Sequence, residues 1–426
     1  MSDQIAPDGT VVIIGSGVAA ATAAESLRKE GFGGRVMMIS NDAEYPYRRP
    51  QLSKELLQGA IAFERSRLRP PDFWEEQNVE IVRGATVTDI DTAERVVLLD
   101  NGEQQRYDAL LIATGGRPRA VPGFAPEEQS NVHYLRSVAD VEPLRKAIEE
   151  PGALLIIGAG LIGCEVAATA RGLGSEVILL EAGDRPLGRV LPEPVAEIYS
   201  KMHRDNGVDL WTNVELDQLD VRPDGVTAIS PRGQVWSGSS ALISVGMAPN
   251  TDLADRAGIS IDTSGRGGII VDKYCRTSDP HVYAAGDVAI FPNLLLGGVQ
   301  RVEHWNNAQE QGAHAARAIL GMPTPFADVP WCWTKQYGKN LQIAGWPSPD
   351  DELIVHGSLE DHDFTVLCLR NERLIGVISM GRPKEFRSAR ALINDAPYIR
   401  RKVLEEGIPT TAPLAIPDLS SASARK

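Results

Sequence analysis

The sequence predicts an α/β fold with two dinucleotide-binding domains and a smaller C-terminal α+β domain. Two observations predict the first part: an apolar run leads into a glycine-rich turn and then a helix near residue 11, and the same order returns near residue 154. Apolar runs of this length are typical of strands buried on both faces of a sheet. A third observation predicts the last domain, because from Pro325 onward the pattern changes to antiparallel strands followed by late helices.

Composition and charge are those of an ordinary globular protein. The chain has 426 residues, of which 43% are hydrophobic and 23% charged, and its net charge of −14 argues against nucleic acid as a partner. No apolar run is long enough to span a bilayer, and residues 1–9 lack the apolar core of a signal peptide. We therefore expect a cytoplasmic location and no membrane span.

The four cysteines are scattered and include no C-x-x-C pair. We expect Cys164, Cys275, Cys332 and Cys368 to be reduced, mostly buried thiols. This spacing predicts neither a zinc site nor a redox disulfide, so we expect no metal site.

The first glycine motif predicts a phosphate-binding turn. Residues 11–20 read VVIIGSGVAA, in which Gly15, Gly17 and Ala20 give the spacing G-x-G-x-x-A. The glycines allow a tight turn, and the helix expected over 21–30 would aim its N-terminal N–H groups at a pyrophosphate. A glycine turn between any strand and helix is the alternative, but the strand and helix on either side favour a dinucleotide.

The second strand of this unit is expected over residues 35–40. An acid at the end of that strand would hold an adenosine ribose. Asn41 and Asp42 stand there, and either could do so, Asp42 better because a carboxylate accepts two hydroxyl hydrogen bonds. The alternative is a turn, which both residue types favour.

The segment over residues 45–59 reads YPYRRPQLSKELLQG. Arg49 precedes a proline and predicts an extended entry, and Leu52 and Ser53 predict a helix start with Lys54 in its first turn. A lysine there opposes the helix dipole and indicates an anionic or electron-rich partner. A solvated surface lysine is the alternative.

The second glycine motif lies in residues 154–174 and has the spacing G-x-G-x-x-G. Its glycines are Gly158, Gly160 and Gly163. The next strand, expected over 176–180, ends in Glu181, at the usual distance for a ligand of a ribose 2′-hydroxyl. A carboxylate would repel a 2′-phosphate, so the sequence favours NADH over NADPH, although Arg185 is close enough to weaken this preference.

The motifs GSGVAA and PYRRPQLSKELL together resemble the FAD-dependent, NADH-using ferredoxin reductases of oxygenase systems. That family belongs to the pyridine nucleotide-disulfide oxidoreductase superfamily but lacks its redox disulfide. The resemblance covers roughly residues 10–405 and finds the family's motifs in the family's order. It implies two Rossmann-like domains of the glutathione reductase type, bound FAD, NADH as donor, and a ferredoxin that feeds an oxygenase as acceptor.

The resemblance also implies roles for single residues. It implies that Lys54 lies beside the flavin and pairs with Glu165, which we expect in the first turn of the second nucleotide-binding helix. This pair would position the nicotinamide and is the predicted catalytic pair. A carboxylate stabilised by the helix dipole is the alternative for Glu165. The remaining candidate cofactor-binding residues are Ala19, Arg49, Val87, Ala113, Thr114, Gly115, Arg136, Gly286, Asp287, Trp305 and Trp333.

Some of these candidates have simpler alternatives. Asp287 follows a buried strand and could cap a helix, Arg136 could be a surface arginine, and Trp305 could be a core tryptophan. The sequence also departs from the family, because Gln51 replaces a usual proline and Lys335 a usual aspartate. Asn41 stands where the family often has an acid.

The cysteine content of residues 41–59 distinguishes this chain from related flavoenzymes with other functions. A disulfide oxidoreductase would need a cysteine pair after the first unit, and a peroxidase or NADH oxidase at least one, but residues 41–59 contain none. Two alternatives stay open: a rubredoxin reductase, and an NADH-responsive flavoprotein of the apoptosis-inducing-factor type.

Two basic clusters suggest where a partner docks. Residues 370–402 hold nine basic against three acidic residues, and residues 48–69 hold six against two, giving local charges of +6 and +4. A solvated face is the usual explanation. In an acidic protein these clusters favour an acidic, ferredoxin-type iron–sulfur partner, and we expect a monomer or a weak dimer.

The predicted domains follow from the order of the motifs. We expect the FAD-binding domain over 1–116 and 247–324, the NADH-binding domain over 117–246, and the C-terminal α+β domain over 325–408. Small antiparallel inserts are expected over 80–99 and 208–244. Residues 409–426, rich in proline, serine and alanine, are expected to be a disordered tail.

Overall fold

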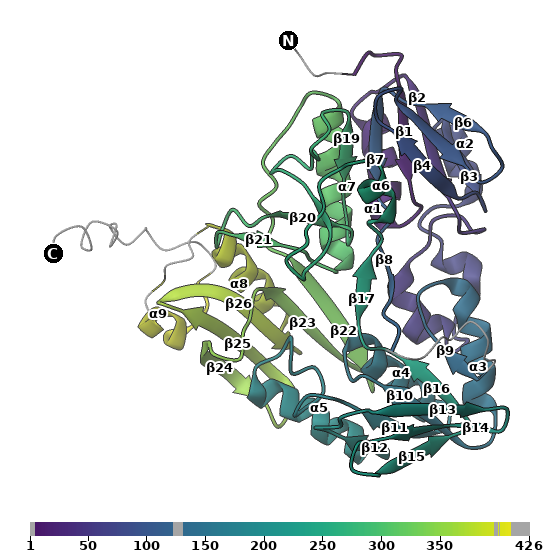
Figure 1. Cartoon of the computed structure of the whole chain (residues 1–426). Helices are drawn as coiled ribbons and strands as arrows, with labels where there is room; N and C mark the ends of the chain where they lie inside the picture. The colour runs from purple at the N-terminus through teal and green to yellow at the C-terminus, as the bar shows by residue number, and fades with distance from the viewer. Residues whose placement is uncertain (1–4, 122–130, 396–398, 400, 410–426) are drawn as a thin grey trace. The chain divides into compact units, whose positions relative to one another are not determined.

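The structure is a computed structural model that describes residues 5–121, 131–395, 399 and 401–409 (Figure 1). These residues form two compact units. Unit 1 lies within Met1–Arg119, Leu135–Glu142 and Gly246–Asp328, and unit 2 within Ala120–Tyr134, Pro143–Val245 and Val329–Lys426. Apart from residue 409, the predicted tail lies outside the described residues.

Unit 1 is built on a five-stranded parallel sheet in the order β19-β7-β1-β2-β3. Its strands are β1 Thr10–Ile14, β2 Arg35–Ser40, β3 Val79–Arg83, β7 Ala109–Ile112 and β19 Val282–Ala284. Strand β1 is buried on both faces, because Val11 and Ile13 belong to one apolar core while Val12 and Ile14 belong to another. This is the arrangement that an unbroken apolar run predicts.

Two helices pack together on one face of this sheet, α1 Val18–Lys29 and α7 Trp305–Ile319 (Figure 1). They approach closely at Gly312, where a Cβ atom would lie 2.3 Å from the carbonyl oxygen of Ala19. Helix α1 begins at Val18, three residues before the predicted start, because Gly17 rather than Ala20 is its N-cap. The shorter helices of unit 1 are α2 Pro71–Glu76 and α6 Asp252–Arg256.

The other strands of unit 1 lie outside its parallel sheet. The antiparallel insert is β4 Val87–Asp91, β5 Val96–Leu99 and β6 Gln104–Arg106. The prediction over 80–99 was wrong at both ends. Strand β3 belongs to the parallel sheet, so the insert begins at Val87, and it continues through β6 to Arg106. The remaining small strands are β8 Gly116–Pro118, β17 Met247–Pro249, β18 Ile269–Ile270, β20 Ala289–Pro292 and β21 Val299–Gln300.

Unit 2 contains a second five-stranded parallel sheet in the order β12-β11-β10-β16-β9. Its strands are β9 Val132–His133, β10 Ala153–Ile157, β11 Glu176–Leu180, β12 Val208–Trp211 and β16 Ser240–Ile243. The helices are α4 Leu161–Gly172, α5 Glu193–Asp205 and all but the first two residues of α3 Val141–Glu149. Within residues 208–244 only β13 Gln218–Arg222, β14 Gly225–Ile229 and β15 Val235–Gly238 are antiparallel, so the insert is shorter than predicted.

An antiparallel sheet in the order β22-β23-β26-β25-β24 follows in the same unit. The strands are β22 Trp331–Gln336, β23 Lys339–Gly345, β24 Glu352–Ser358, β25 Asp363–Arg370 and β26 Arg373–Met380, and the helices are α8 Pro383–Asp395 and α9 Arg401–Glu406. Strand β22 packs on α4, and α8 packs on β26. This confirms the predicted α+β character of the C-terminal part. No helix in the described ranges is long and apolar enough to cross a membrane.

Candidate functional site

The first glycine turn has one glycine that packing requires and one that it does not. Gly15 has a φ of +118°, and a Cβ atom there would lie 2.4 Å from the carbonyl oxygen of Ala113 at the end of β7. Gly17, the N-cap of α1, has a φ of −69°, and a Cβ atom there would meet no protein atom within 4 Å. The open space beside Gly17 therefore fits a phosphate at the helix N-terminus.

In the second glycine turn, packing again requires some of the glycines and leaves space beside another. At Gly158 a Cβ atom would lie 2.4 Å from the carbonyl oxygen of Ser244, and at Gly163 only 2.0 Å from that of Gly158. Gly160, the N-cap of α4, has a φ of −75° and open space where its side chain would be. Each unit thus presents one strand–turn–helix with room for a phosphate.

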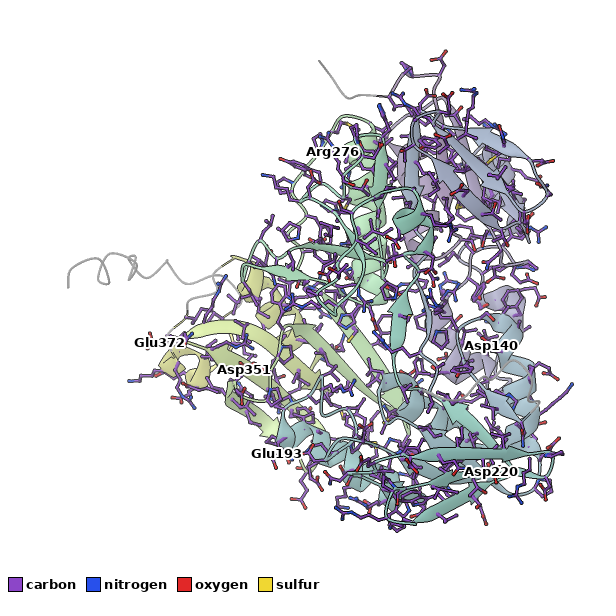
Figure 2. All side chains as sticks on the ribbon, viewed as in Figure 1. Asp140, Glu193, Asp220, Arg276, Asp351 and Glu372 are labelled. Atoms are coloured by element: carbon purple, nitrogen blue, oxygen red, sulfur yellow. The ribbon has the colours of Figure 1, made fainter. Side chains whose placement is uncertain are left out.

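Glu181 follows β11 directly and has a fixed orientation. Its carboxylate accepts hydrogen bonds from the backbone N–H groups of Ala159 and Gly183, each at 2.7 Å. Arg185, which weakened the preference for NADH in the sequence, pairs with Asp184 at 2.6 Å and with Glu193 at 3.0 Å. Glu193 is labelled in Figure 2. These two carboxylates neutralise the cation that would otherwise attract a 2′-phosphate.

The equivalent position in unit 1 is occupied by serine. Gly15 donates its N–H to Ile39 at 2.8 Å, as Gly158 does to Leu180 in unit 2, and this register matches Ser40 rather than Asn41 or Asp42 with Glu181. The Ser40 hydroxyl lies 2.8 Å from the hydroxyl of Ser16.

Asp42 lies in a turn. Its carboxylate accepts the Tyr47 hydroxyl at 2.9 Å and the Glu44 N–H at 3.1 Å, while Asn41 is exposed. The structure thus supports the turn that the sequence gave as the alternative for Asp42. The ribose ligand of unit 1 remains a prediction.

Lys54 lies in an unusual helical turn. A 3₁₀ turn over Arg49–Gln51 continues into a π-helical turn over Leu52–Leu56, a form that is frequent at functional sites. Lys54 is only 8% exposed, and its ammonium group donates to the Ser53 hydroxyl at 3.4 Å. The surface-lysine alternative is therefore wrong.

Arg136 belongs to a cluster formed by three distant segments of unit 1. Its guanidinium pairs with Asp287 at 3.4 Å and lies 3.0 Å from the place where a Cβ atom of Gly115 would be. The Arg49 guanidinium donates to the Arg136 carbonyl oxygen. Burial lowers the pKa of Arg136, and the neighbouring Arg49 lowers it further, while Asp287 raises it. Two guanidinium groups thus lie close together while only Arg136 is paired with a carboxylate, an arrangement suited to an anionic ligand. The Arg136 side chain is 28% exposed, so the surface alternative is wrong.

The turn that follows β19 lies where three elements of unit 1 meet. The Gly286 N–H donates to the buried Gln311 side chain at 2.8 Å, and a Cβ atom at Gly286 would lie 3.1 Å from that of Ala19. A turn and then β20 follow Asp287, so the helix-cap alternative for Asp287 is contradicted.

Most of the other candidate residues of unit 1 are packed into the protein or hydrogen-bonded within it. Val87 and Ala113 are buried, and Trp305 is the first residue of α7 and packs against the core of that face. The Thr114 hydroxyl donates to the carbonyl oxygen of Asn250 at 2.9 Å. The Asn250 amide donates back to the carbonyl oxygen of Thr114, also at 2.9 Å. Asn250 closes the turn after β7, a role that the sequence did not identify.

Glu165 lies in the second turn of α4, because that helix begins at Leu161, so the predicted first-turn position was wrong. The side chain is 3% exposed, and Oε1 accepts the Thr334 hydroxyl at 2.9 Å. Trp333 precedes Thr334 on β22, with its ring 5.6 Å from that of Trp331. Lys54 belongs to unit 1 and Glu165 to unit 2, and their predicted ion pair remains a prediction.

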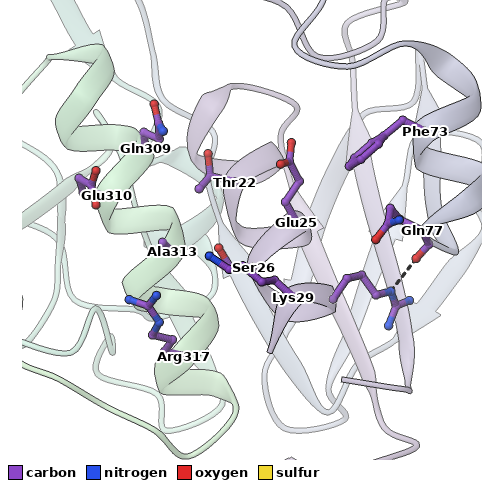
Figure 3. Close-up of a pocket in the computed structure, with 11 residues that line it drawn as sticks. Thr22, Glu25, Ser26, Lys29, Phe73, Gln77, Gln309, Glu310, Ala313 and Arg317 are labelled. Atoms are coloured by element: carbon purple, nitrogen blue, oxygen red, sulfur yellow. Dashed lines mark hydrogen bonds between the residues drawn. The ribbon is translucent and has the colours of Figure 1, made fainter. Parts of the chain in front are cut away.

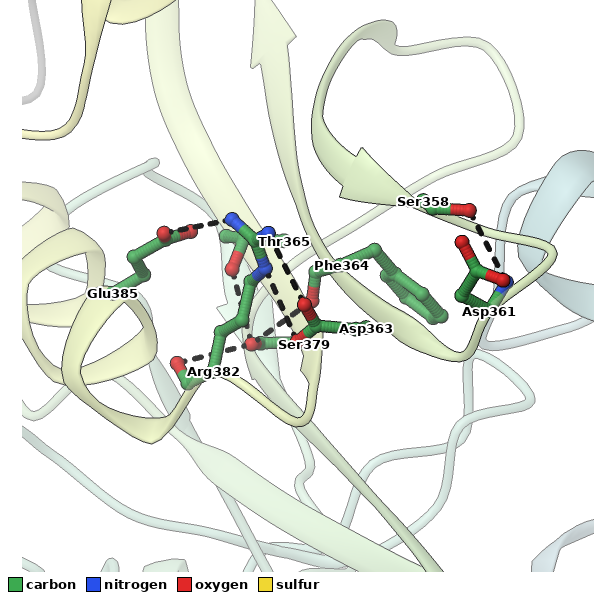
Figure 4. A network of polar contacts seen from close by, with 8 residues as sticks. All are labelled: Ser358, Asp361, Asp363, Phe364, Thr365, Ser379, Arg382 and Glu385. Carbon is green, nitrogen blue, oxygen red and sulfur yellow. Dashed lines mark hydrogen bonds and ion pairs between the residues drawn. The ribbon is translucent and has the colours of Figure 1, made fainter.

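Tertiary ion pairs offset much of the basic cluster over 370–402. Arg370 pairs with Asp351 and Arg401 with Glu352, two acids that lie outside the counted segment. Arg382 pairs with Asp363 and with Glu385 (Figure 4). The Arg390 guanidinium lies over the Trp331 ring at 5.6 Å. The net local charge of +6 was therefore an overestimate, and Arg387 is an exposed member of the cluster.

The cluster over 48–69 is reduced in the same way. Arg67 pairs with Glu44 at 3.5 Å, and Arg69 pairs with Glu25 at 2.8 Å. A groove of about 400 Å³ lies near the second of these pairs, between α1 and α7 (Figure 3). Its lining includes Glu25, Phe73 and Arg317 and none of the predicted cofactor residues.

Two parallel sheets, each with an open glycine at its first helix, define a protein with two nucleotide-binding folds. Residues 9–312 match the family model described as pyridine nucleotide-disulphide oxidoreductase, and residues 331–408 match the model described as reductase C-terminal. The chain belongs to the pyridine nucleotide-disulphide oxidoreductase family and is an oxidoreductase. The family expected from the sequence is confirmed.

Individual relatives are similar over most of their length. The chain is 37% identical to rhodocoxin reductase of Rhodococcus erythropolis over 388 residues, which is 90% of this chain and 89% of that protein. It is 37% identical over 395 residues to the ferredoxin–NAD(+) reductase subunit of the benzene 1,2-dioxygenase system of Pseudomonas putida, covering 90% and 92%. The crystal structure of the covalent putidaredoxin reductase–putidaredoxin complex matches with a TM-score of 0.88 and 34% identity, covering 93% and 95%.

The two kinds of glycine predict opposite effects of alanine. Gly15→Ala should lower the free energy of unfolding by about 1–3 kcal/mol, because its Cβ atom overlaps backbone. Gly17→Ala should change it by less than about 1 kcal/mol but leave the purified protein with little flavin. Urea unfolding and the flavin absorbance per chain measure the two effects. Full flavin content in Gly17→Ala would contradict the phosphate site.

Proposed function

We propose that this chain is an NADH-dependent flavoprotein reductase that passes electrons through FAD to a ferredoxin serving an oxygenase. The observation that carries the proposal is the pair of open N-cap glycines, Gly17 in unit 1 and Gly160 in unit 2, each at a turn shaped for a nucleotide phosphate. The names of the relatives favour ferredoxin as the acceptor, since they include a ferredoxin–NAD(+) reductase subunit of a dioxygenase system.

FAD is assigned to unit 1 because its candidate residues converge there. Gly17 would face the pyrophosphate together with the N-terminus of α1, and the Arg49–Arg136 cluster would offset the negative charge of the phosphates. Asp287 would accept hydroxyl hydrogen bonds from the sugar-alcohol chain, as the family resemblance implies. When bound, FAD accepts an electron pair from NADH and releases electrons singly.

NADH is assigned to unit 2. Gly160 would face its pyrophosphate, and Glu181 would accept from the adenosine ribose hydroxyls, since its carboxylate is already held at the end of β11. Lys54 and Glu165 are assigned to the place where the nicotinamide meets the flavin. Both side chains are buried, as charged groups that act in a low-dielectric site would be.

We also propose the charge of the partner, the oligomeric state and the location of the protein. An acidic ferredoxin would suit the exposed basic groups of the cluster over 370–402, such as Arg387, and a monomer or weak dimer is proposed. A cytoplasmic location is proposed because all four cysteines are free and buried, and burial raises the pKa of each thiol. The domain boundaries predicted from the sequence are retained as part of this proposal.

Two alternatives differ in what accepts the electrons. Rubredoxin would replace ferredoxin without changing either nucleotide site. An NADH-responsive flavoprotein of the apoptosis-inducing-factor type would show slow turnover with every acceptor and would dimerise when NADH is added.

The cofactor assignment is tested by absorbance. The purified protein should be yellow, and anaerobic NADH should bleach the flavin band much faster than NADPH does. A colourless preparation that cannot be reconstituted with FAD would refute the proposed function.

The donor preference should depend on Glu181. In Glu181→Gln the ratio of kcat/KM for NADH over NADPH should fall by at least about 10-fold, because the like-charge repulsion of a 2′-phosphate is removed. Glu176→Gln is the matched control, since Glu176 is exposed at the opposite end of β11. An unchanged ratio in Glu181→Gln would show that another group selects the donor.

Docking of an acidic ferredoxin should depend on Arg387. Arg387→Gln should lower kcat/KM for ferredoxin about 3- to 10-fold at low ionic strength, and the difference should vanish at high salt. Arg401→Gln is the matched control, because Arg401 is already paired with Glu352 and Glu405. Equal loss in both variants, or in neither, would exclude Arg387 from the docking surface.

A further inference from the structure

His203 is a buried titratable residue with no place in the function proposed so far. It lies on α5 in unit 2 and is 0% exposed. Both ring nitrogens have partners, Nε2 with Oε1 of Gln336 at 3.0 Å and Nδ1 with the hydroxyl of Tyr337 at 2.8 Å. A fully buried histidine with two hydrogen bonds has one orientation available to it.

The hydrogen bonds continue from Gln336 to Glu165. The Gln336 amide donates from Nε2 to Oγ1 of Thr334 at 3.1 Å, and Thr334 donates to Oε1 of Glu165 at 2.9 Å. Thr334 and Gln336 are two residues apart on β22, so they lie on the same face of the strand, and both are buried. The chain of bonds thus joins α5, β22 and α4.

Every donor in this chain points toward the carboxylate. The Thr334 hydroxyl donates to Glu165, and its oxygen is left to accept from the Gln336 amide. The carbonyl oxygen of Gln336 then requires a proton on Nε2 of His203. Burial lowers the pKa of His203 to about 4, so the ring is neutral near pH 7 and its Nδ1 accepts from Tyr337.

We propose that Thr334, Gln336 and His203 form a positioning chain that fixes the orientation of the Glu165 carboxylate. The role of Glu165 beside the nicotinamide rests on the function proposed above, whereas the chain rests on the hydrogen bonds of unit 2. A glutamate side chain is flexible, and a hydrogen bond to a charged acceptor is about twice as strong as a neutral one. Turning Glu165 away would leave the buried Thr334 hydroxyl without its acceptor, which is costly.

The direct test removes the hydroxyl that contacts Glu165. Thr334→Val keeps the shape of the side chain but cannot donate, and it should slow flavin reduction at saturating NADH by about 10- to 100-fold, as loss of a positioning group does. The dissociation constant for NADH should change by less than about 3-fold, because ground-state binding is not the step affected. Thr334→Ser restores the hydroxyl and should restore the rate.

The matched control is Thr365→Val. Thr365 is a buried threonine in the same antiparallel sheet, where its hydroxyl lies 3.1 Å from that of Ser379 (Figure 4). In the Thr365→Val variant, NADH should reduce the flavin at the wild-type rate. Gln336→Met breaks the chain one bond further from Glu165 and should slow reduction in the same direction by a smaller factor, which serves if Thr334→Val does not fold.

A second readout does not use activity. Thr334→Val should lower the urea midpoint of unfolding, because the Glu165 carboxylate loses a buried donor. In a Glu165→Leu background the same change should lower the midpoint by a smaller amount, since only the Gln336 amide then loses its partner. Additive midpoint changes would overturn the positioning chain.

The kinetic outcomes separate the two proposals. Wild-type rates in Thr334→Val, failure of Thr334→Ser to restore the rate, or an equal loss in Thr365→Val would each overturn the positioning chain. If Glu165→Gln reduces flavin at the wild-type rate, the assigned role of Glu165 fails instead, and the urea measurements decide on the chain.

Discussion

The absence of a side chain at Gly15 and at Gly158 sets the geometry of both proposed nucleotide sites. At Gly15 and at Gly158, the first atom of a side chain would overlap a backbone oxygen beyond the neighbouring strand of the sheet. Because the backbone can approach so closely there, the chain turns sharply and the next helix begins within three residues. The open faces of Gly17 and Gly160 follow from that turn. Each unit repeats this arrangement, so the protein contains two proposed nucleotide sites of the same design.

Strands that are specified by a continuous run of apolar residues could be predicted from the sequence. The strands over 35–40 and 176–180 have the predicted bounds, since continuous apolar runs have one structural explanation in a parallel sheet. The start of α1 was predicted three residues late because the N-cap is a glycine whose capping role is invisible in its side chain. The turn after β2 shows the same limit, because Asp42 hydrogen-bonds to Tyr47 and a lone acid cannot reveal its partner.

Contacts between distant residues could not be predicted from one sequence. Thr334 and Glu165 are 169 positions apart, and no spacing rule joins them. The net charge predicted for residues 370–402 was too high for the same reason. A count along the segment omits Asp351 and Asp363, which lie outside it but pair with its arginines. The burial of Lys54 could not be predicted from its residue type, because lysine is usually exposed. The family resemblance, which places this lysine beside the flavin, was the better guide.

The contact of Gly312 with Ala19 has a consequence for synthesis of the chain. Helix α7 packs against α1, and β19 completes the sheet that β1 begins, so unit 1 draws essential parts from beyond residue 280. Contacts of such long sequence separation form late and slowly. On the ribosome, the first hundred residues must therefore wait, with apolar surface uncovered, until most of the protein has been translated. Chaperones that shield nascent chains have their strongest reason to act during that interval.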